Sequence, residues 1–383
     1  MKIIGLESFV LQGSLGENSF GWATGIAHQR QTALCLVTTD EGIRGVGEAY
    51  YYGGPSKIVA GFMRDVYGPV LVGRDPLDTS ILWDLLYNRT RDQGTKGLPI
   101  CALSAIDIAL WDIKGKALGL PVYKLLGGAY RDKALVYATG LFESQSQPDK
   151  KRALVEEALG YKKDGFPAMK LKVGYGVERD VEYVKAIREA IGYDLKLMID
   201  ANRAYTVAEA IRLAREVEGY KISWFESPLP PEDIDGLLEL KQKSLVPIAG
   251  GKDEFTRYGF RDLIVRRAVD IIEPNLGAAG GFTEMMKISA LASAFNIQLT
   301  PYVRNTNVGL AASLQFFATL PPFPDRRYPG ENYFELDRSP HPFRDSVTQE
   351  KFLIQDGHIP IPQNPGLGIT LDWDIIKKHQ VAF

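Results

Sequence analysis

Cysteine is scarce in this chain of 383 residues, which contains only Cys35 and Cys101, each inside an apolar stretch. A disulfide-stabilised scaffold of this length would need more than one pair of cysteines. We therefore expect two buried free thiols and a reducing, cytoplasmic setting.

Long apolar runs and an excess of charge are also missing. No run approaches the roughly 18 apolar residues that a membrane-spanning helix needs, and residues 1–5 lack the apolar core of a signal peptide. The formal net charge is −2, whereas a nucleic-acid-binding protein normally carries a clustered basic excess. We expect a small molecule as the partner, with no membrane and no nucleic acid.

The first 125 residues have the patterns of strands and then of helices. Strand patterns cover residues 2–11 and 32–39, and residues 40–42 (DEG) predict a tight turn into a return strand. Helical periodicity follows and reaches Gly119, a typical helix stop. This order indicates an α+β domain over residues 1–125.

After residues 127–128 (GG), short apolar runs alternate with amphipathic helical stretches. Eight runs have the pattern of strands: 135–138, 168–173, 195–200, 222–226, 248–250, 271–273, 297–300 and 333–336. Their spacing of roughly 25 to 35 residues predicts an α/β fold, a parallel (β/α) barrel of the TIM type over residues 126–350. The tail, residues 351–383, has strand-like patterns at 352–354 and 365–369, and we expect it to pack back on the first domain.

Polar residues end these apolar strands, at intervals of 23 to 33 residues from Lys172 onward. Active sites of (β/α) barrels lie at the carboxyl ends of the strands. The candidate site residues are therefore Lys170, Lys172, Asp200, Asn202, Glu226, Lys252, Asn275, Tyr302 and Glu335.

Lys170 and Lys172 lie two residues apart on a strand, so both point to the same face. Inside a barrel, two ammonium groups must lie near carboxylates, or one must lose its proton. A lysine that is desolvated beside another cation has a lowered pKa and can act as a base near neutral pH. A solvated surface pair is the other interpretation, which the apolar neighbours of both lysines disfavour.

Asp200 and Glu226 end adjacent predicted strands and point toward the same mouth. Hard oxygen ligands of this kind suit magnesium, which keeps room for substrate oxygens. A structural cluster of salt bridges with the two lysines fits the same residues equally well. The spacing alone leaves both interpretations open.

Several short motifs follow one another along nearly the whole chain: 102–112 (ALSAIDIALWD), 125–128 (LLGG), 170–174 (KLKVG), 200–202 (DAN), 224–226 (WFE), 280–281 (GG) and 365–368 (PGLG). Together they resemble the mandelate racemase and muconate-lactonising branch of the enolase superfamily. Within that branch, residues 87–94 (YNRTRDQG), 137–140 (YATG) and 334–338 (FELDR) are most similar to galactarolactone cycloisomerases and sugar-acid dehydratases.

The resemblance implies an isomerase or lyase that acts on a sugar acid or its lactone, by cycloisomerisation or dehydration. In that family magnesium holds the substrate carboxylate while a base removes the adjacent proton. The resemblance implies Lys172 as the base, Lys170 as a neutralising cation, and Asp200 and Glu226 as metal ligands. It also implies a symmetric homo-oligomer.

The resemblance further implies that the first domain closes over the barrel as a cap and selects the substrate. Its loops would be residues 20–23 and 50–54. Four of the strand-end residues are predicted to contact the substrate: Asn202, Lys252, Asn275 and Glu335.

The third metal ligand departs from the family pattern, in which a glutamate follows a Gly-Gly pair. Here Gly250-Gly251 is followed by Lys252. Two carboxylates with one protonated lysine carry the same net charge as three carboxylates with one divalent cation. Lys252 can therefore take over the electrostatic role of the metal in a buried cluster, with magnesium excluded or weakly bound. The competing hypothesis is that Glu254 turns inward as a replacement ligand.

The opposite face of the barrel also departs from the family pattern. The family has an aspartate–histidine pair there, and the matching positions in this chain are Asn275 and Tyr302. None of the four histidines ends a predicted strand: His28, His341, His358 and His379. Tyr302 does not titrate near pH 7 without a strong perturbation. It can still donate a hydrogen bond, or act as a high-pKa acid toward a leaving oxygen.

Two other functions stay open at this point. In a metal-free enzyme, one of the lysines Lys170, Lys172 or Lys252 would form a Schiff base with a carbonyl substrate. In a non-catalytic homologue, the barrel would bind a carboxylate without turnover.

Overall fold

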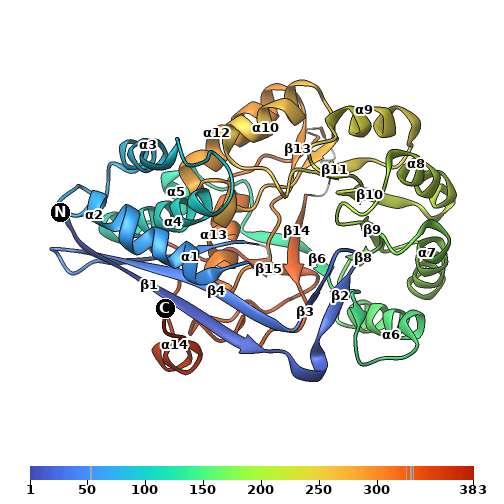
Figure 1. Cartoon of the computed structure of the whole chain (residues 1–383), viewed down its shortest axis with the longest axis horizontal. Coiled ribbons are helices and arrows are strands. Elements are labelled where there is room, and N and C mark those ends of the chain that lie inside the picture. The colour runs from blue at the N-terminus through green and yellow to red at the C-terminus, as the bar shows by residue number, and fades with distance from the viewer. Residues whose placement is uncertain (52–53, 325, 328–329, 331) are drawn as a thin grey trace.

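The computed structural model describes residues 1–51, 54–324, 326–327, 330 and 332–383, and Figure 1 shows a sheet domain set against a helix-ringed barrel. The predicted fold class, a barrel of parallel strands and helices with a smaller α+β domain, is confirmed. Within the described ranges, no helix combines the length and the apolar character that a membrane span requires.

The N-terminal domain is an antiparallel sheet covered by helices. Its strands, in the order β1-β4-β5, are β1 (Ile3–Ser14), β4 (Gln29–Thr39) and β5 (Arg44–Ala49). Its helices are η1 (Gly16–Asn18), α1 (Ser56–Gly61), η2 (Phe62–Tyr67), α2 (Gly68–Leu71), α3 (Thr79–Thr90), α4 (Leu98–Leu118) and α5 (Val122–Leu125). Helix α4 lies directly on β5, because a Cβ at Gly45 or Gly47 would fall 2.0 Å or 1.8 Å from a carbonyl oxygen of α4. The helix ends before Gly119, which has the left-handed φ of 67° that a glycine stop requires.

Both thiols lie in the core of this domain. Cys35 on β4 and Cys101 on α4 are buried and free, which confirms the prediction of two buried free thiols. Burial raises the pKa of each thiol to about 12. Neither cysteine is therefore a reactive thiolate near neutral pH.

The barrel contains eight parallel strands, hydrogen-bonded in the order β13-β12-β11-β10-β9-β8-β6-β14. They are β6 (Lys133–Thr139), β8 (Ala168–Lys172), β9 (Lys196–Asp200), β10 (Ile222–Glu226), β11 (Ile248–Gly250), β12 (Ile271–Ile272), β13 (Gln298–Leu299) and β14 (Tyr333–Asp337), within two residues of the predicted strands. The helices between them are α6 (Lys150–Lys163), α7 (Val177–Ile191), α8 (Val207–Glu216), η3 (Glu218–Tyr220), α9 (Ile234–Lys243), α10 (Thr256–Val265), α11 (Leu276–Ala279), α12 (Gly281–Ala294) and α13 (Asn307–Ala318). Glu335 on β14 bridges the two ends of this path, since its carboxylate accepts a hydrogen bond from Val303 N, after β13, at 2.6 Å.

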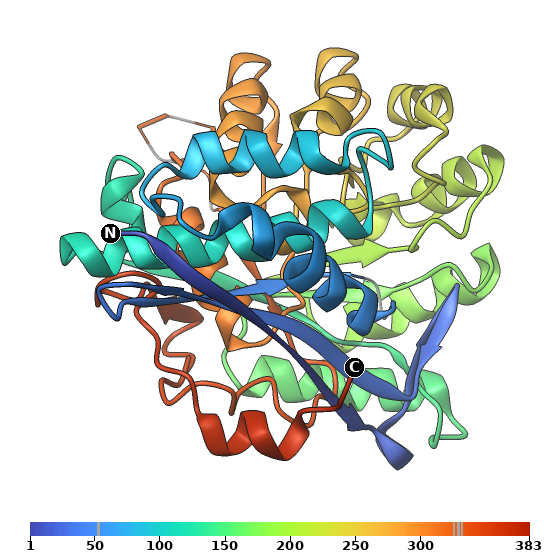
Figure 2. The same cartoon turned by 60° about the vertical axis from the view of Figure 1, so that its left-hand side comes forward.

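A small sheet joins the two domains. In it, β2 (Phe20–Trp22) pairs with β3 (Gly25–Ala27) and with β7 (Glu143–Ser144), which follows β6 of the barrel. The view in Figure 2 shows the N-terminal sheet and its helices lying in front of the barrel. The β2–β7 pairing therefore holds residues 20–27 over the carboxyl ends of the barrel strands.

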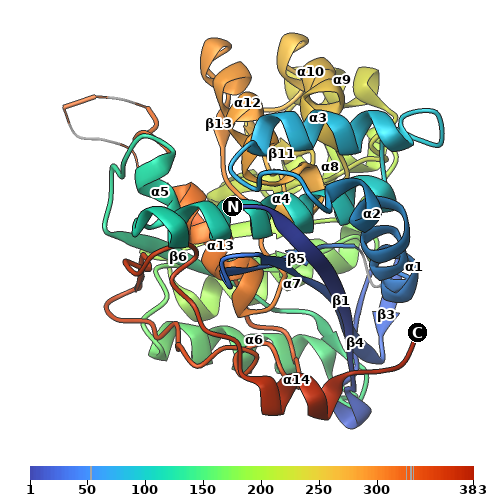
Figure 3. The ribbon, with the colours of Figure 1, turned by 90° about the vertical axis from the view of Figure 1, so that its left-hand side faces the viewer.

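The tail contacts both domains. Strand β15 (His358–Pro360) adds to β6, and helix α14 (Trp373–His379) lies beside β1 (Figure 3). Val381 N also donates a hydrogen bond to Val10 O at 2.9 Å. The strand predicted at residues 352–354 is wrong: Leu353 is 67% exposed, and a turn with positive φ at residues 356–357 brings His358 onto β6 instead. The domain limits at residues 125 and 350 remain predictions.

Candidate active site

The interior of the barrel is layered, because side chains along a strand alternate between its two faces. Toward the amino ends of the strands the layer is apolar: Tyr137, Ala168, Met198, Trp224, Ala249, Ile271 and Tyr333. Two residues further along five of these strands, the buried side chains are ionisable: Lys170, Asp200, Glu226, Glu273 and Glu335. We call these five residues, together with Lys172 and Lys252, the ion layer.

Lys170 is held as a cation inside the ion layer. Its ammonium nitrogen lies 2.5 Å from Glu226 Oε2 and 2.9 Å from Glu335 Oε1. Burial alone would lower the pKa of Lys170, but these two carboxylates raise it well above its usual value. The side chains of Lys170 and Lys172 are 0% and 3% exposed, which excludes a solvated surface pair.

Lys252 lies between the two carboxylates that the sequence predicted as metal ligands. Its ammonium nitrogen is 2.8 Å and 2.9 Å from the two carboxylate oxygens of Asp200, and 3.2 Å from Glu226 Oε1. Burial would lower the pKa of Lys252, but Asp200 and Glu226 raise it, so the group stays charged. In the described part of the chain, no three His, Cys, Asp or Glu side chains come together as metal ligands. The residues present therefore do not fit a magnesium ion.

Lys172 differs from the other two lysines because its ion pair involves a single carboxylate, that of Asp200. Its ammonium group also faces the ring of Phe142, 5.1 Å from the ring centroid. Burial, together with the charges of Lys252 and Lys170, outweighs Asp200 and lowers the pKa of Lys172 to about 8. A fraction of the Lys172 side chains is therefore neutral near pH 7 and able to accept a proton.

Glu273 is a member of the ion layer that sequence reasoning missed. It follows β12 and is 1% exposed, and within the described residues neither of its carboxylate oxygens has a hydrogen-bond partner. Burial and the nearby charge of Glu226 raise its pKa well above the usual value, which favours the neutral acid. With Glu273 protonated, three lysines face three carboxylates, so the ion layer is neutral overall.

A cavity of about 410 Å³ lies above the ion layer, between the two domains. Lys172, Asn202 and Tyr302 line it from the barrel. Trp22, Tyr50 and Tyr51, from the predicted cap loops, line it from the N-terminal domain, whereas Tyr52 and Gly53 lie outside the described residues. Of the four residues predicted to contact substrate, Asn202 reaches this cavity, and Lys252, Asn275 and Glu335 are buried outside its wall in the described structure.

Tyr302 lines the cavity and lies close to Lys170 and Lys252 of the ion layer. The ammonium groups of Lys170 and Lys252 lie 5.8 Å and 6.0 Å from the centroid of its ring. Its hydroxyl oxygen is 2.9 Å from that of Tyr50, and burial raises its pKa well above the usual value, so it stays protonated. Asn275 supports this position, because its side-chain amide donates to the carbonyl oxygen of Tyr302 at 2.8 Å.

Sequence reasoning also missed three arginines beside the cavity. Arg30 and Arg344 each lie 3.0 Å from Asp337 Oδ2, and Arg304 lies 3.6 Å from the same oxygen. Arg30 and Arg304 line the cavity. One carboxylate thus faces three guanidinium groups, which leaves this wall of the cavity positively charged.

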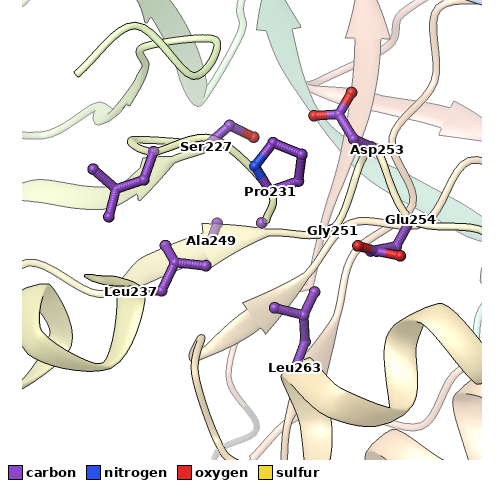
Figure 4. Close-up of a pocket in the computed structure, with 10 residues that line it drawn as sticks. Ser227, Pro231, Leu237, Ala249, Gly251, Asp253, Glu254 and Leu263 are labelled. Atoms are coloured by element: carbon purple, nitrogen blue, oxygen red, sulfur yellow. The ribbon is translucent and has the colours of Figure 1, made fainter. Parts of the chain in front are cut away.

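Glu254, the competing candidate for the third metal ligand, lies elsewhere. Its carboxylate forms an ion pair with Lys96 of the N-terminal domain at 2.6 Å. Figure 4 shows Glu254 and Asp253 on the segment after Gly251, beside a pocket of about 20 Å³, which is room for about one water molecule. In this arrangement Glu254 is not a member of the ion layer.

The fold and the site together define a class of protein. They describe a two-domain (β/α)-barrel protein, in which the buried lysine Lys172 at a strand end lines a cavity between the barrel and the N-terminal domain. The chain belongs to the enolase superfamily: residues 11–127 match the mandelate racemase / muconate lactonizing enzyme N-terminal domain, and residues 153–375 match the enolase C-terminal domain-like family. The family predicted from the motifs is confirmed.

The chain is also similar to individual proteins over nearly their whole length. The chain is 40% identical to D-galactarolactone cycloisomerase of Agrobacterium fabrum (100% of this chain, 99% of the relative) and 34% identical to arabinonate dehydratase of Saccharolobus solfataricus (92% and 91%). Its structure is similar to that of 3,6-anhydro-D-galactonate cycloisomerase from Zobellia galactanivorans, with a TM-score of 0.89, 40% identity and full coverage of both chains.

Magnesium is present in one similar structure. A racemase from Streptomyces coelicolor with bound magnesium has a TM-score of 0.88 and 28% identity to this chain, covering 99% of this chain and 100% of the racemase. The predicted use of magnesium therefore has a precedent among similar structures. In the present chain, Lys252 stands between Asp200 and Glu226.

Proposed function

We propose that the protein is an isomerase or lyase that converts a sugar acid or its lactone, by removing the proton next to the carboxylate. The observation that carries this proposal is Lys172: a lysine at a barrel strand end, lining the cavity, whose pKa is lowered to about 8. The relatives named above are cycloisomerases and dehydratases of sugar acids or lactones, which supports the same chemistry.

Lys172 is the proposed base, and the other lysines of the ion layer keep its pKa low through their charge. Lys170 and Lys252 hold Asp200 and Glu226 by ion pairs, so the carboxylates are fixed and paired without any further cation. Tyr302 is the proposed proton donor, because its protonated hydroxyl group lies at the cavity. A leaving hydroxyl or a ring oxygen would take that proton.

The proposal does not depend on magnesium. If an ion were bound, Asp200 and Glu226 would be the residues to hold it, and it would polarise the substrate carboxylate. Lys252 occupies three of their oxygens instead, and we propose that magnesium binds weakly or not at all. We also propose a cytoplasmic homo-oligomer whose partner is a small carboxylate, without nucleic acid or membrane.

The test is exchange of the α-proton with solvent deuterium, followed by NMR over a panel of sugar acids and their lactones. We expect exchange for at least one compound, and Lys172→Ala should slow it by about 10²- to 10⁴-fold, the usual contribution of a positioned base. Lys196→Ala is the matched control, because Lys196 is exposed at the opposite end of an adjacent strand.

Absence of exchange across the whole panel would contradict the proposal. Two measurements then separate the remaining functions. A mass adduct after borohydride treatment with 2-keto acids would indicate the Schiff-base enzyme. Ligand-induced thermal stabilisation without turnover would indicate a non-catalytic carboxylate-binding protein.

A further inference from the structure

The ion layer offers the substrate no free cation at the position of the metal. Three carboxylate oxygens surround the ammonium group of Lys252, which has three N–H donors in all. A magnesium ion in the same place would keep coordination positions for a substrate carboxylate, whereas Lys252 has none left. Lys252 is not among the described residues that line the cavity, whereas Tyr302, whose ring centroid is 6.0 Å from this ammonium group, does line it.

The substrate carboxylate therefore needs another cationic partner, and the cavity wall contains one. The side chain of Arg304 is 8% exposed, and this residue lines the cavity. Of its five N–H donors, one makes a hydrogen bond in the described part of the chain, from Nη2 to Ser339 Oγ at 3.1 Å. Asp337 is shared with Arg30 and Arg344, so it does not neutralise Arg304 fully.

The geometry relates this arginine to the proposed base. Arg304 Cζ lies 4.8 Å from the centroid of the Phe142 ring, and Lys172 Nζ lies 5.1 Å from the same centroid. The two cations are consequently no more than 9.9 Å apart, on a shared aromatic wall. Arg304 and Lys172 both line the cavity, so one ligand in it can contact both side chains.

We infer that Arg304, assisted by Arg30, binds the substrate carboxylate directly, in a site built from the cavity wall. The inference rests on the proposed function, because it takes the ligand to be a sugar acid. It makes Arg304 and Arg30 binding residues and gives Lys252 a purely positioning role. Substrate binding is then independent of magnesium.

The test is isothermal titration calorimetry of the full-length protein with D-galactonate, D-gluconate and galactarate, in buffer containing EDTA. Galactitol serves as the uncharged probe of the same carbon skeleton. We expect Arg304→Gln to raise the Kd of the acid that binds by at least tenfold, the usual worth of a charge-assisted contact. Arg304→Lys should recover part of the loss, because it keeps the charge without the planar fork. Galactitol should bind weakly to every variant.

Arg344→Gln is the matched control. Arg344 contacts the same oxygen of Asp337 at 3.0 Å but is not among the described residues that line the cavity. Its Kd should rise clearly less than that of Arg304→Gln, since Arg344 makes no ligand contact and acts on Arg304 only through the shared carboxylate of Asp337. Circular dichroism and thermal unfolding check that each variant is folded, and Arg30→Gln gives a second variant of the site.

Three outcomes would overturn the inference: equal weakening by Arg304→Gln and Arg344→Gln, binding that requires magnesium, or no binding of any acid on the panel. Deuterium exchange separates this inference from the proposed reaction. Arg304-dependent binding without exchange would support the carboxylate site and contradict the proposed reaction. Exchange, together with binding that is unchanged in Arg304→Gln, would support the proposed reaction and contradict the carboxylate site.

Discussion

Two regions of the barrel mouth, the ends of β8 and of β11, each present a lysine to Asp200, with different results. At the end of β8, Lys172 is paired with Asp200 alone, lines the cavity, and has its pKa lowered to about 8. After β11, Lys252 is paired with both Asp200 and Glu226, is fully buried, and has its pKa raised. The number of carboxylates around each ammonium group thus decides which lysine has a lowered pKa and which stays a fixed cation.

The difference shows how lysines in the same ion layer can have pKa values shifted in opposite directions. Burial removes both ammonium groups from water, and this effect alone would lower the pKa of each lysine. At Lys252, Asp200 and Glu226 together more than offset the effect of burial. The positive charge of Lys252 in turn lowers the pKa of Lys172. Lys252, at the position where the resemblance predicts a metal ligand, therefore pairs with both carboxylates and lowers the pKa of its neighbour Lys172.

The largest expected effect is the loss of Lys252. In Lys252→Met, two buried carboxylates lose a shared partner, and breaking such a cluster typically costs about 3–5 kcal/mol in the free energy of unfolding. Urea unfolding of the two proteins measures the difference. In Lys252→Glu, three carboxylates meet, and magnesium should bind stoichiometrically and restore about 3 kcal/mol at a hundredfold excess over its Kd.

Metal content and calorimetry with MgCl₂ provide the controls. Lys252→Met should gain no stability from magnesium, because it adds no ligand. The assignment of Lys252 is wrong if the natural protein binds magnesium stoichiometrically, or if Lys252→Glu is as stable without magnesium as with it.

The next expected effect is on the rate of exchange, whose dependence on pH tests the contrast between Lys172 and Lys252. The neutral amine of Lys172 becomes populated as pH rises through about 8, so the exchange rate should rise about tenfold from pH 7 to pH 9 and then level off. NMR exchange rates at saturating and low substrate measure the profile. In Lys252→Met the lowering effect of the neighbouring charge is lost, so the profile should move to higher pH. A profile that is flat or falls between pH 7 and 9 would rule out Lys172 as the base.

The barrel was predictable because apolar strands with polar ends recur at a regular spacing, and eight strands appear within two residues of their predicted positions. The pairing of β2 with β7 could not be predicted from the sequence, because a strand of two residues, such as β7, has no periodicity of its own. The tail strand was misplaced because residues 352–354 have the composition of a strand, while pairing depends on a turn at residues 356–357.

The candidate site was predictable where residues lie on the strands themselves. Lys170, Asp200 and Glu226 follow directly from the alternation of side chains. The same alternation from Ile271 would have found Glu273, which was overlooked in favour of Asn275, two residues further on. Arg304 lies on a segment beyond its strand, where its orientation depends on partners from two distant segments, around Phe142 and around Asp337, rather than on spacing.

The smallest expected effect is that of substituting Glu254. This substitution tests whether Glu254 acts as a metal ligand at the end of β11. Its partner Lys96 is 56% exposed, and a pair of this kind usually contributes about 1 kcal/mol or less to the free energy of unfolding. Glu254→Gln should therefore change stability by no more than that, and leave metal content and exchange rate unchanged. Glu226→Gln, which removes a carboxylate paired with two buried lysines, should cost several-fold more in the same urea titration. If the natural protein binds magnesium and Glu254→Gln loses it, then Glu254 turns inward when the ion is present, and the two ends of the mouth are less different than their lysines indicate.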